Sequence, residues 1–219
     1  GGGFHRYSTD DHWLVPHFEK MLYDNALLVR AYLDAYRITR QNTYKRIVEE
    51  TLDFVIREML DSNGGFYSTQ DADSEGVEGK FYVWDEEEFN DVVGEDSKLL
   101  GRFFDVSQTG NFENMNILQI KRPAHLFAKM EGLDDTELEL KIGIARKKLF
   151  ERRESRLRPA MDRKILTDWN GLMLRAFAEA ATYLNRADYR KVAESNAQFL
   201  ISEMWDGSRL LHSYKDGNA

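Results

Sequence analysis

The sequence predicts an all-α fold built from αα-hairpin repeats, with short β-hairpins in the long loops. Two long segments have apolar residues at helical spacing, the pair recurs later in the chain, and the connections are rich in glycine and β-forming residues. With 219 residues, 42% of them hydrophobic, the chain can bury a sizeable core.

The first hairpin is predicted over residues 19–61. Residues 19–39 are apolar around most of a helix, which is typical of an inner helix buried on all sides. Residues 44–60 carry one apolar stripe, which predicts an amphipathic outer helix. The inner-helix side chains expected to be buried are Tyr23, Leu27, Tyr32 and Tyr36.

An internal repeat predicts a second hairpin over residues 168–205. Residues 25–68 align without a gap to residues 170–213, with 13 identities in 44 positions, against roughly three expected from composition. The inner helix of this copy is expected to bury Leu172, Met173, Phe177 and Ala180.

A third, less regular hairpin is predicted over residues 85–153, with a short or broken inner helix and an outer helix from about residue 134. All three hairpins are expected to form a single domain over residues 1–219. The connection 64–84 predicts two short strands, "FYST" and "KFYVW", on either side of an acidic loop.

Loop lengths predict where a site lies. Inner-to-outer turns such as "RQN" are short, whereas the outer-to-inner connections are long and lead to the N-terminal ends of the inner helices. That end of a helix is partly positive, so polar residues there are expected to border one cavity that favours bound oxygen atoms.

Candidate site residues come from these connections. Histidines and carboxylates can transfer protons, and tryptophan beside hydrogen-bonding groups is the mixture that binds sugars. The predicted catalytic residues are His5, His17, Asp73 and Asp168, and the predicted substrate-binding residues are Arg6, Asp10, Asp71, Trp84, Trp169 and Asn170. The structural alternative is helix capping, with Thr167 or Asp168 as a cap and Glu19 at the start of the first inner helix.

No metal or cofactor is expected. Residues 71–76 imitate the start of a calcium loop, but Tyr82 occupies the twelfth position, where a bidentate Glu is required. The polar tip of a β-hairpin is therefore the stronger interpretation, with sugar-binding carboxylates as a third. The absence of cysteine excludes thiolate zinc sites and thiol catalysis within this chain.

Composition argues against two classes of partner. The formal net charge is −8 and no basic stripe occurs, so neither nucleic acid nor an anionic membrane is an expected partner. No apolar run approaches 18 residues, and residues 1–10 lack the features of a signal peptide. A cytoplasmic location is therefore expected.

Three long motifs carry a family resemblance over nearly the whole chain. The segments "GGGFHRYSTDDHWLVPHFEKMLYDNALL", "GGFYSTQDADSEGVEGKFYVW" and "DRKILTDWNGLM" resemble the C-terminal helical region of the YyaL and spermatogenesis-associated protein twenty-like thioredoxin-domain family. The resemblance implies an (α/α)₆ toroid similar to those of N-acylglucosamine 2-epimerases and six-hairpin glycosidases. The three hairpins would make about half of such a toroid.

The resemblance implies two functions of different classes. One is a carbohydrate-active domain in a thioredoxin-domain-containing protein, with sugar isomerase or epimerase activity preferred over glycoside hydrolase activity. The other is a non-catalytic helical module that binds a partner or client beside the thioredoxin domain. The expected partners are a saccharide or other small polyol, the thioredoxin-like domain, the remaining toroid hairpins, and a second copy of this chain through self-association.

Overall fold

A computed structural model describes residues 1–219 and confirms a mainly helical fold with short antiparallel strands. The chain divides into two compact units. Unit 1 comprises Gly1–Arg6, Phe18–Ala72 and Ala160–Ala219, and unit 2 comprises Tyr7–His17 and Asp73–Pro159. None of the helices is both long and apolar enough to cross a membrane.

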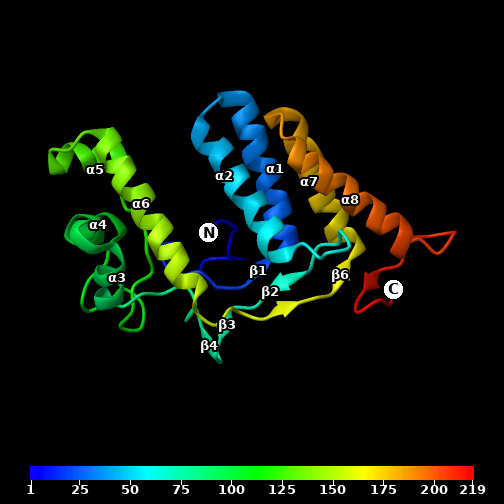
Figure 1. Cartoon of the computed structure of the whole chain (residues 1–219), viewed down its shortest axis with the longest axis horizontal. Coiled ribbons are helices and arrows are strands. Elements are labelled where there is room, and N and C mark those ends of the chain that lie inside the picture. Colours follow the sequence, from blue (N-terminus) through cyan, green and yellow to red (C-terminus); the bar gives the residue numbers. More distant parts are fainter. The chain divides into compact units, whose positions relative to one another are not determined.

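Unit 1 consists of two αα-hairpins that pack side by side (Figure 1). The first joins α1 (Leu22–Thr39) to α2 (Asn42–Phe54), which continues as a π-helical segment, η1 (Val55–Met59). The second joins α7 (Thr167–Leu184) to α8 (Ala187–Glu203). Both inner helices end on a left-handed residue at equivalent positions of the repeat, Arg40 and Asn185, so the sequence repeat is a structural repeat.

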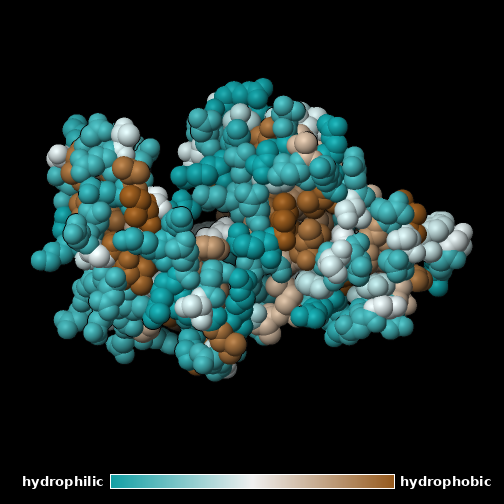
Figure 2. Space-filling view, in the orientation of Figure 1, coloured by the Kyte–Doolittle hydropathy of each residue, from teal (hydrophilic) through white to brown (hydrophobic).

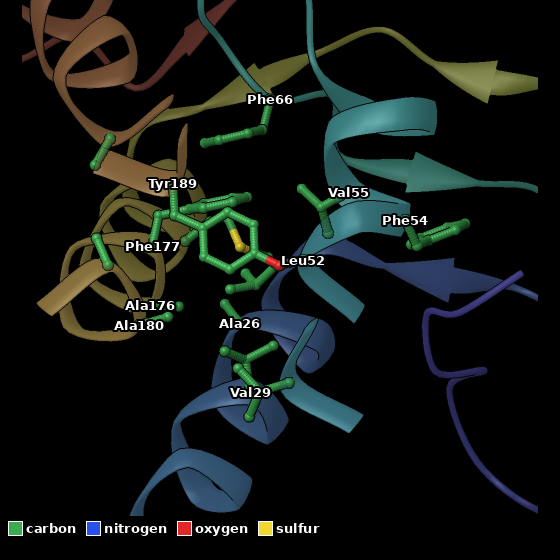
Figure 3. Close-up of a cluster of buried hydrophobic side chains, with 14 of the residues drawn as sticks. Ala26, Val29, Leu52, Phe54, Val55, Phe66, Ala176, Phe177, Ala180 and Tyr189 are labelled. Carbon is green, nitrogen blue, oxygen red and sulfur yellow. The ribbon is translucent and has the colours of Figure 1, made fainter. Parts of the chain in front are cut away.

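Both hairpins contribute to one hydrophobic core. Figure 3 shows Phe177 and Tyr189 of the second hairpin facing Ala26, Val29 and Leu52 of the first. Phe66 stacks on Phe177 with 5.4 Å between the ring centroids and 4° between the ring planes. The inner helices therefore meet through apolar side chains.

The inner helices are not buried on all sides. Met173, Phe177 and Ala180 are buried, and Leu172, Tyr23, Tyr32 and Tyr36 are partly buried. The prediction for Leu27 is wrong, because its side chain is 47% exposed. Within unit 1 the packing partners of α1 are α2 and α7, so the side of α1 that carries Leu27 remains open.

A repeated asparagine fastens a glycine-rich loop to each inner helix. Asn25 accepts a hydrogen bond from the Phe4 backbone N–H at 2.7 Å and donates to the Phe4 carbonyl oxygen at 3.2 Å. Asn170 makes the same two bonds with Phe66, at 2.8 and 3.0 Å. The loop needs glycine before the phenylalanine, since a Cβ on Gly65 would lie 2.5 Å from Ile165.

Short strands lie at the N-terminal ends of α1 and α7. β1 (Lys20–Met21), β2 (Thr69–Gln70) and β5 (Met161–Asp162) form an antiparallel three-stranded sheet. β6 (Ile165–Leu166) pairs with β7 (Ser213–Tyr214). The "FYST" strand thus begins later than predicted and includes Gln70.

Unit 2 contains the acidic loop, and here the strand prediction is wrong. β3 (Asp73–Ser74) pairs with β4 (Val77–Glu78), so the acidic segment is itself the hairpin. Its turn residues, Glu75 and Gly76, both have positive φ, as a two-residue hairpin turn requires. The segment "KFYVW" forms a turn instead, and of these residues only Trp84 pairs, as an isolated bridge with Asn116.

The helices of unit 2 confirm the predicted broken inner helix. α3 (Glu86–Val93), the 3₁₀ turn η2 (Gly94–Asp96) and α4 (Ser97–Phe104) replace one long helix. α6 (Asp135–Glu154) is the predicted outer helix, whereas α5 (Ala124–Glu131) was not predicted. Together these helices bury a second hydrophobic core.

Candidate functional site

The open face of the three-stranded sheet in unit 1 carries a shallow hollow of about 330 Å³. Because side chains alternate along a strand, Glu19, Thr69 and Asp162 share this face, while Lys20 and Gln70 are buried on the other. The complete lining is Glu19, Thr69, Asp71, Ala160, Met161 and Asp162. Three carboxylates therefore face one hollow, and Asp71 is one of the predicted site residues.

Two of these carboxylates have defined hydrogen-bond environments. The Glu19 carboxylate accepts from the Arg6 guanidinium at 3.1 Å. Desolvation acts to raise the pKa of Asp162, but hydrogen bonds from the Lys164 backbone and side chain outweigh it, so the pKa lies below its usual range. The hollow can therefore accept hydrogen bonds from the hydroxyl groups of a ligand.

Arg6 links the hollow to the first turn of α1. Its guanidinium also hydrogen-bonds the Tyr23 side chain, which together with Glu19 raises the pKa of Arg6. Backbone pairing holds the segment in place, since the Arg6 N–H donates to the Glu19 carbonyl oxygen at 2.9 Å. A permanent positive charge thus lies between a carboxylate and a phenol.

Asp24 lies next to this group in the first turn of α1. Its Oδ2 atom is buried and has no hydrogen-bond partner. Burial raises the pKa of Asp24, Arg6 opposes the shift, and Glu19 reinforces it. This carboxyl is therefore easier to protonate than an ordinary aspartate.

The first turn of α7 contributes the aromatic part. Trp169 packs against Tyr23 edge to face, with 4.8 Å between the ring centroids. The capping interpretation is wrong, because Leu166 is the N-cap and makes no side-chain cap. Thr167 donates to the Leu211 carbonyl oxygen, and exposed Asp168 accepts only from the next backbone N–H, that of Trp169, at 2.9 Å.

His5 belongs to the same unit. Its Nδ1 lies 2.8 Å from the carbonyl oxygen of Phe18, which can only accept, so Nδ1 carries the proton in this bond. In the neutral ring the lone pair is then on Nε2. A neutral imidazole accepts a proton at its unprotonated nitrogen.

His17 and Asp73 lie together in unit 2, around a residue that the sequence reasoning missed. His17 Nδ1 is 2.7 Å from a Glu78 carboxylate oxygen, and its ring lies 5.0 Å from the Tyr7 ring. Asp73 is the cross-strand partner of Glu78, so both side chains lie on one face of the β3–β4 hairpin. A carboxylate bound to Nδ1 fixes the orientation of the imidazole ring.

Three other predicted site residues have structural roles. Asp10 accepts from the backbone N–H groups of Leu14 and Val15 and closes its own loop; these bonds, led by that from Val15, lower its pKa. Trp84 is buried in the core of unit 2. Asn170 is fully buried and bonded to Phe66, as described above.

The predicted residues are thus distributed over both units. Unit 1 holds His5, Arg6, Asp71, Asp168, Trp169 and Asn170, and unit 2 holds Asp10, His17, Asp73 and Trp84. The sequence reasoning omitted Glu19, Tyr23, Asp24 and Glu78 from the site. Glu19 was assigned to the start of a helix, but α1 begins at Leu22 and Glu19 immediately precedes β1. No group of three or more His, Asp or Glu side chains is arranged to hold a metal ion.

Comparison with known proteins yields relatives in sequence. No protein-family model matches the chain. It is 34% identical over 232 residues to spermatogenesis-associated protein 20 of Homo sapiens, a match that covers 94% of this chain and 30% of the human protein. The chain is a homologue of one region of spermatogenesis-associated protein 20. The protein of the same name from Mus musculus is also 34% identical, over 95% of this chain and 30% of the mouse protein.

Solved structures give weaker matches. D-mannose isomerase aligns with 14% identity and a TM-score of 0.32, over 98% of this chain and 49% of the isomerase chain. Cellobiose 2-epimerase from Spirochaeta thermophila aligns with 11% identity and a TM-score of 0.30, over all of this chain and 51% of the epimerase chain.

Proposed function

We propose that this chain is a carbohydrate-active domain that binds a saccharide or other small polyol in the hollow of unit 1. The observation that carries the proposal is the continuous group formed by the acidic hollow, the Arg6–Glu19 ion pair and the Tyr23–Trp169 pair. Sugars present hydroxyl groups at their edges and C–H groups on their faces. Carboxylates and a guanidinium match the former, and aromatic rings match the latter.

Proton transfer is the chemistry that this group supports best, which favours a sugar isomerase or epimerase over a glycoside hydrolase. Arg6 can stabilise negative charge on a sugar oxygen, and a neutral His5 can accept a proton at Nε2. His5 and Asp168 are proposed as catalytic in unit 1, and His17 with Asp73 in unit 2. Arg6, Asp71 and Trp169 are proposed as substrate-binding residues.

The larger context is part of the same proposal. The three hairpins would form about half of an (α/α)₆ toroid, and the domain would accompany a thioredoxin-like domain and the remaining hairpins in the whole protein. The homology to a region of spermatogenesis-associated protein 20 supports this context, since the chain spans about 30% of the length of that protein.

Calorimetric titration of the chain with D-glucose, D-mannose and cellobiose tests the proposal. At least one sugar should bind, and Arg6→Ala should weaken its affinity at least about ten-fold, or about 1.4 kcal/mol. Arg37→Ala is the matched control, because Arg37 is also an exposed arginine in unit 1, in the last turn of α1. No binding by any sugar, or equal loss in both variants, would contradict the proposal.

A non-catalytic interaction module is the second candidate, favoured by exposed apolar side chains on unit 2. Figure 2 shows a hydrophobic stripe over α5 and α6. The exposed residues there are Leu126, Met130, Leu140 and Ile144, between 47% and 64% exposed. Such a patch on a monomer marks an interaction surface. Sedimentation velocity would support this candidate if the chain self-associates and Leu140→Glu abolishes the association.

A further inference from the structure

We propose that Asp24 is a further acid–base group of the saccharide site in unit 1, in addition to the proposed His5. This assignment rests on the proposed function. The geometry that supports it is a partly exposed carboxyl in the first turn of α1 with one buried and unpartnered oxygen. The charge of Arg6, which is bound to a different carboxylate, acts on this carboxyl.

The surrounding charges divide the two carboxylates into different roles. Glu19 accepts a hydrogen bond from Arg6 at 3.1 Å, and Tyr23 also hydrogen-bonds this guanidinium. Burial raises the pKa of Asp24 and outweighs the opposing charge of Arg6, while the charge of Glu19 adds to the effect of burial. A site in which neighbouring carboxyls have such different environments separates a fixed charge from a group that can gain and lose a proton.

Asp24 does not cap α1 through a side-chain hydrogen bond. The N-cap of α1 is Met21, which makes no side-chain cap, and Asp24 Oδ2 makes no hydrogen bond within the chain. A buried oxygen without a partner is unfavourable, and less so if the group is neutral. A carboxyl that gains and loses a proton is consistent with this environment.

The step is balanced without an oxidant or a second substrate. The Asp24 carboxylate removes the proton on carbon 2 of an open-chain aldose, and the electron pair of that C–H bond forms the C1–C2 double bond of an enediolate. The electrons of the C1 carbonyl move to its oxygen, whose negative charge is stabilised by Arg6. The carboxyl then returns a proton to carbon 2 or to carbon 1; in the second case the proton on oxygen 2 moves to oxygen 1 and a ketose results.

Deuterium exchange in D₂O tests the step. The chain is incubated with D-glucose, D-mannose and cellobiose, and loss of the carbon-2 proton signal is followed by NMR. We expect exchange with at least one sugar, and a loss of at least about 100-fold in Asp24→Asn. The neutral amide has the shape of the protonated carboxyl, so sugar affinity should change less than about three-fold. Asp34→Asn, on the exposed side of the same helix, is the control and should keep the full rate.

The outcomes separate this inference from the proposed function. If no sugar binds, the proposed function fails and the inference with it. If a sugar binds without carbon-2 exchange, or if Asp24→Asn exchanges within about two-fold of the wild type, only the inference is overturned. If the variant does not fold, the wild-type Asp24 carboxyl is titrated by ¹³C NMR, and a pKa at or below the usual aspartate range overturns the assignment.

Discussion

Replacing Asn170 with alanine should be among the most destabilising single changes in unit 1. The Asn170 amide accepts from the Phe66 N–H at 2.8 Å and donates to the Phe66 carbonyl oxygen at 3.0 Å. It also accepts from Asn196 at 3.0 Å and donates to Leu166 at 2.9 Å. Because Phe66 and Asn170 are 0% exposed, water cannot replace these bonds.

The magnitude follows from the groups left without partners. A buried unpaired donor or acceptor costs about 1–3 kcal/mol, and Asn170→Ala leaves both backbone groups of Phe66 in that state. We therefore expect a loss of about 3–5 kcal/mol. The equivalent Asn25→Ala should cost less, about 1–2 kcal/mol, because Phe4 is partly exposed and water can reach its backbone. Asn42→Ala, at an exposed asparagine, should change stability by less than about 0.5 kcal/mol.

Urea unfolding followed by circular dichroism at 222 nm measures these differences. The midpoint should fall in the order Asn42→Ala, Asn25→Ala, Asn170→Ala with an unchanged slope, since the exposed surface is the same. A cost below about 1 kcal/mol for Asn170→Ala, or equal costs for Asn25→Ala and Asn170→Ala, would refute the reasoning from burial and hydrogen bonding.

Two further predictions concern packing and pH. Gly65→Ala should destabilise by about 1–3 kcal/mol, because its Cβ would lie 2.9 Å from Phe199. Gly171 lies in α7, and a Cβ there would meet no atom within 4 Å, so Gly171→Ala should instead stabilise the protein by about 0.5–1 kcal/mol. Thermal unfolding measures both variants. A melting temperature higher for Gly65→Ala than for Gly171→Ala would contradict this reasoning. The hydrogen bond from Arg186 lowers the pKa of Asp188 to about 2, below its usual 3.8, so its stabilisation is complete above pH 3.8 and is lost as pH falls towards 2. Since Asp188 is mostly exposed, Asp188→Asn should flatten this part of the pH profile by less than about 1 kcal/mol, and an unchanged profile would show that the pair contributes nothing.

The helices could be predicted from sequence because their signal is local. Apolar spacing defined both hairpins of unit 1, and the gapless repeat showed that they are equivalent. The broken helix near Gly94 was also predicted. Strand positions were less accurate, since strands of two residues carry too little alternation to be located, and the acidic segment 73–78 was taken for a loop when it is the hairpin itself.

The candidate site could be predicted only in part. The abundance of polar residues in the connections and at the starts of the inner helices was visible, and Arg6, Asp71 and Trp169 were selected from it. Asn170 was selected for the wrong reason, because its identity with Asn25 in the repeat reflects a shared structural bond to a phenylalanine loop.

The sequence by itself determined the helical hairpins, their repeat and the ends of the helices at which polar residues gather. Only the tertiary structure decided which polar residues meet. The hollow joins segments near residues 19, 70 and 161, and Asn170 bonds Phe66 across 104 positions. Helical periodicity repeats every few residues and is therefore written in the sequence, whereas contacts between distant strands and loops depend on how the whole chain closes.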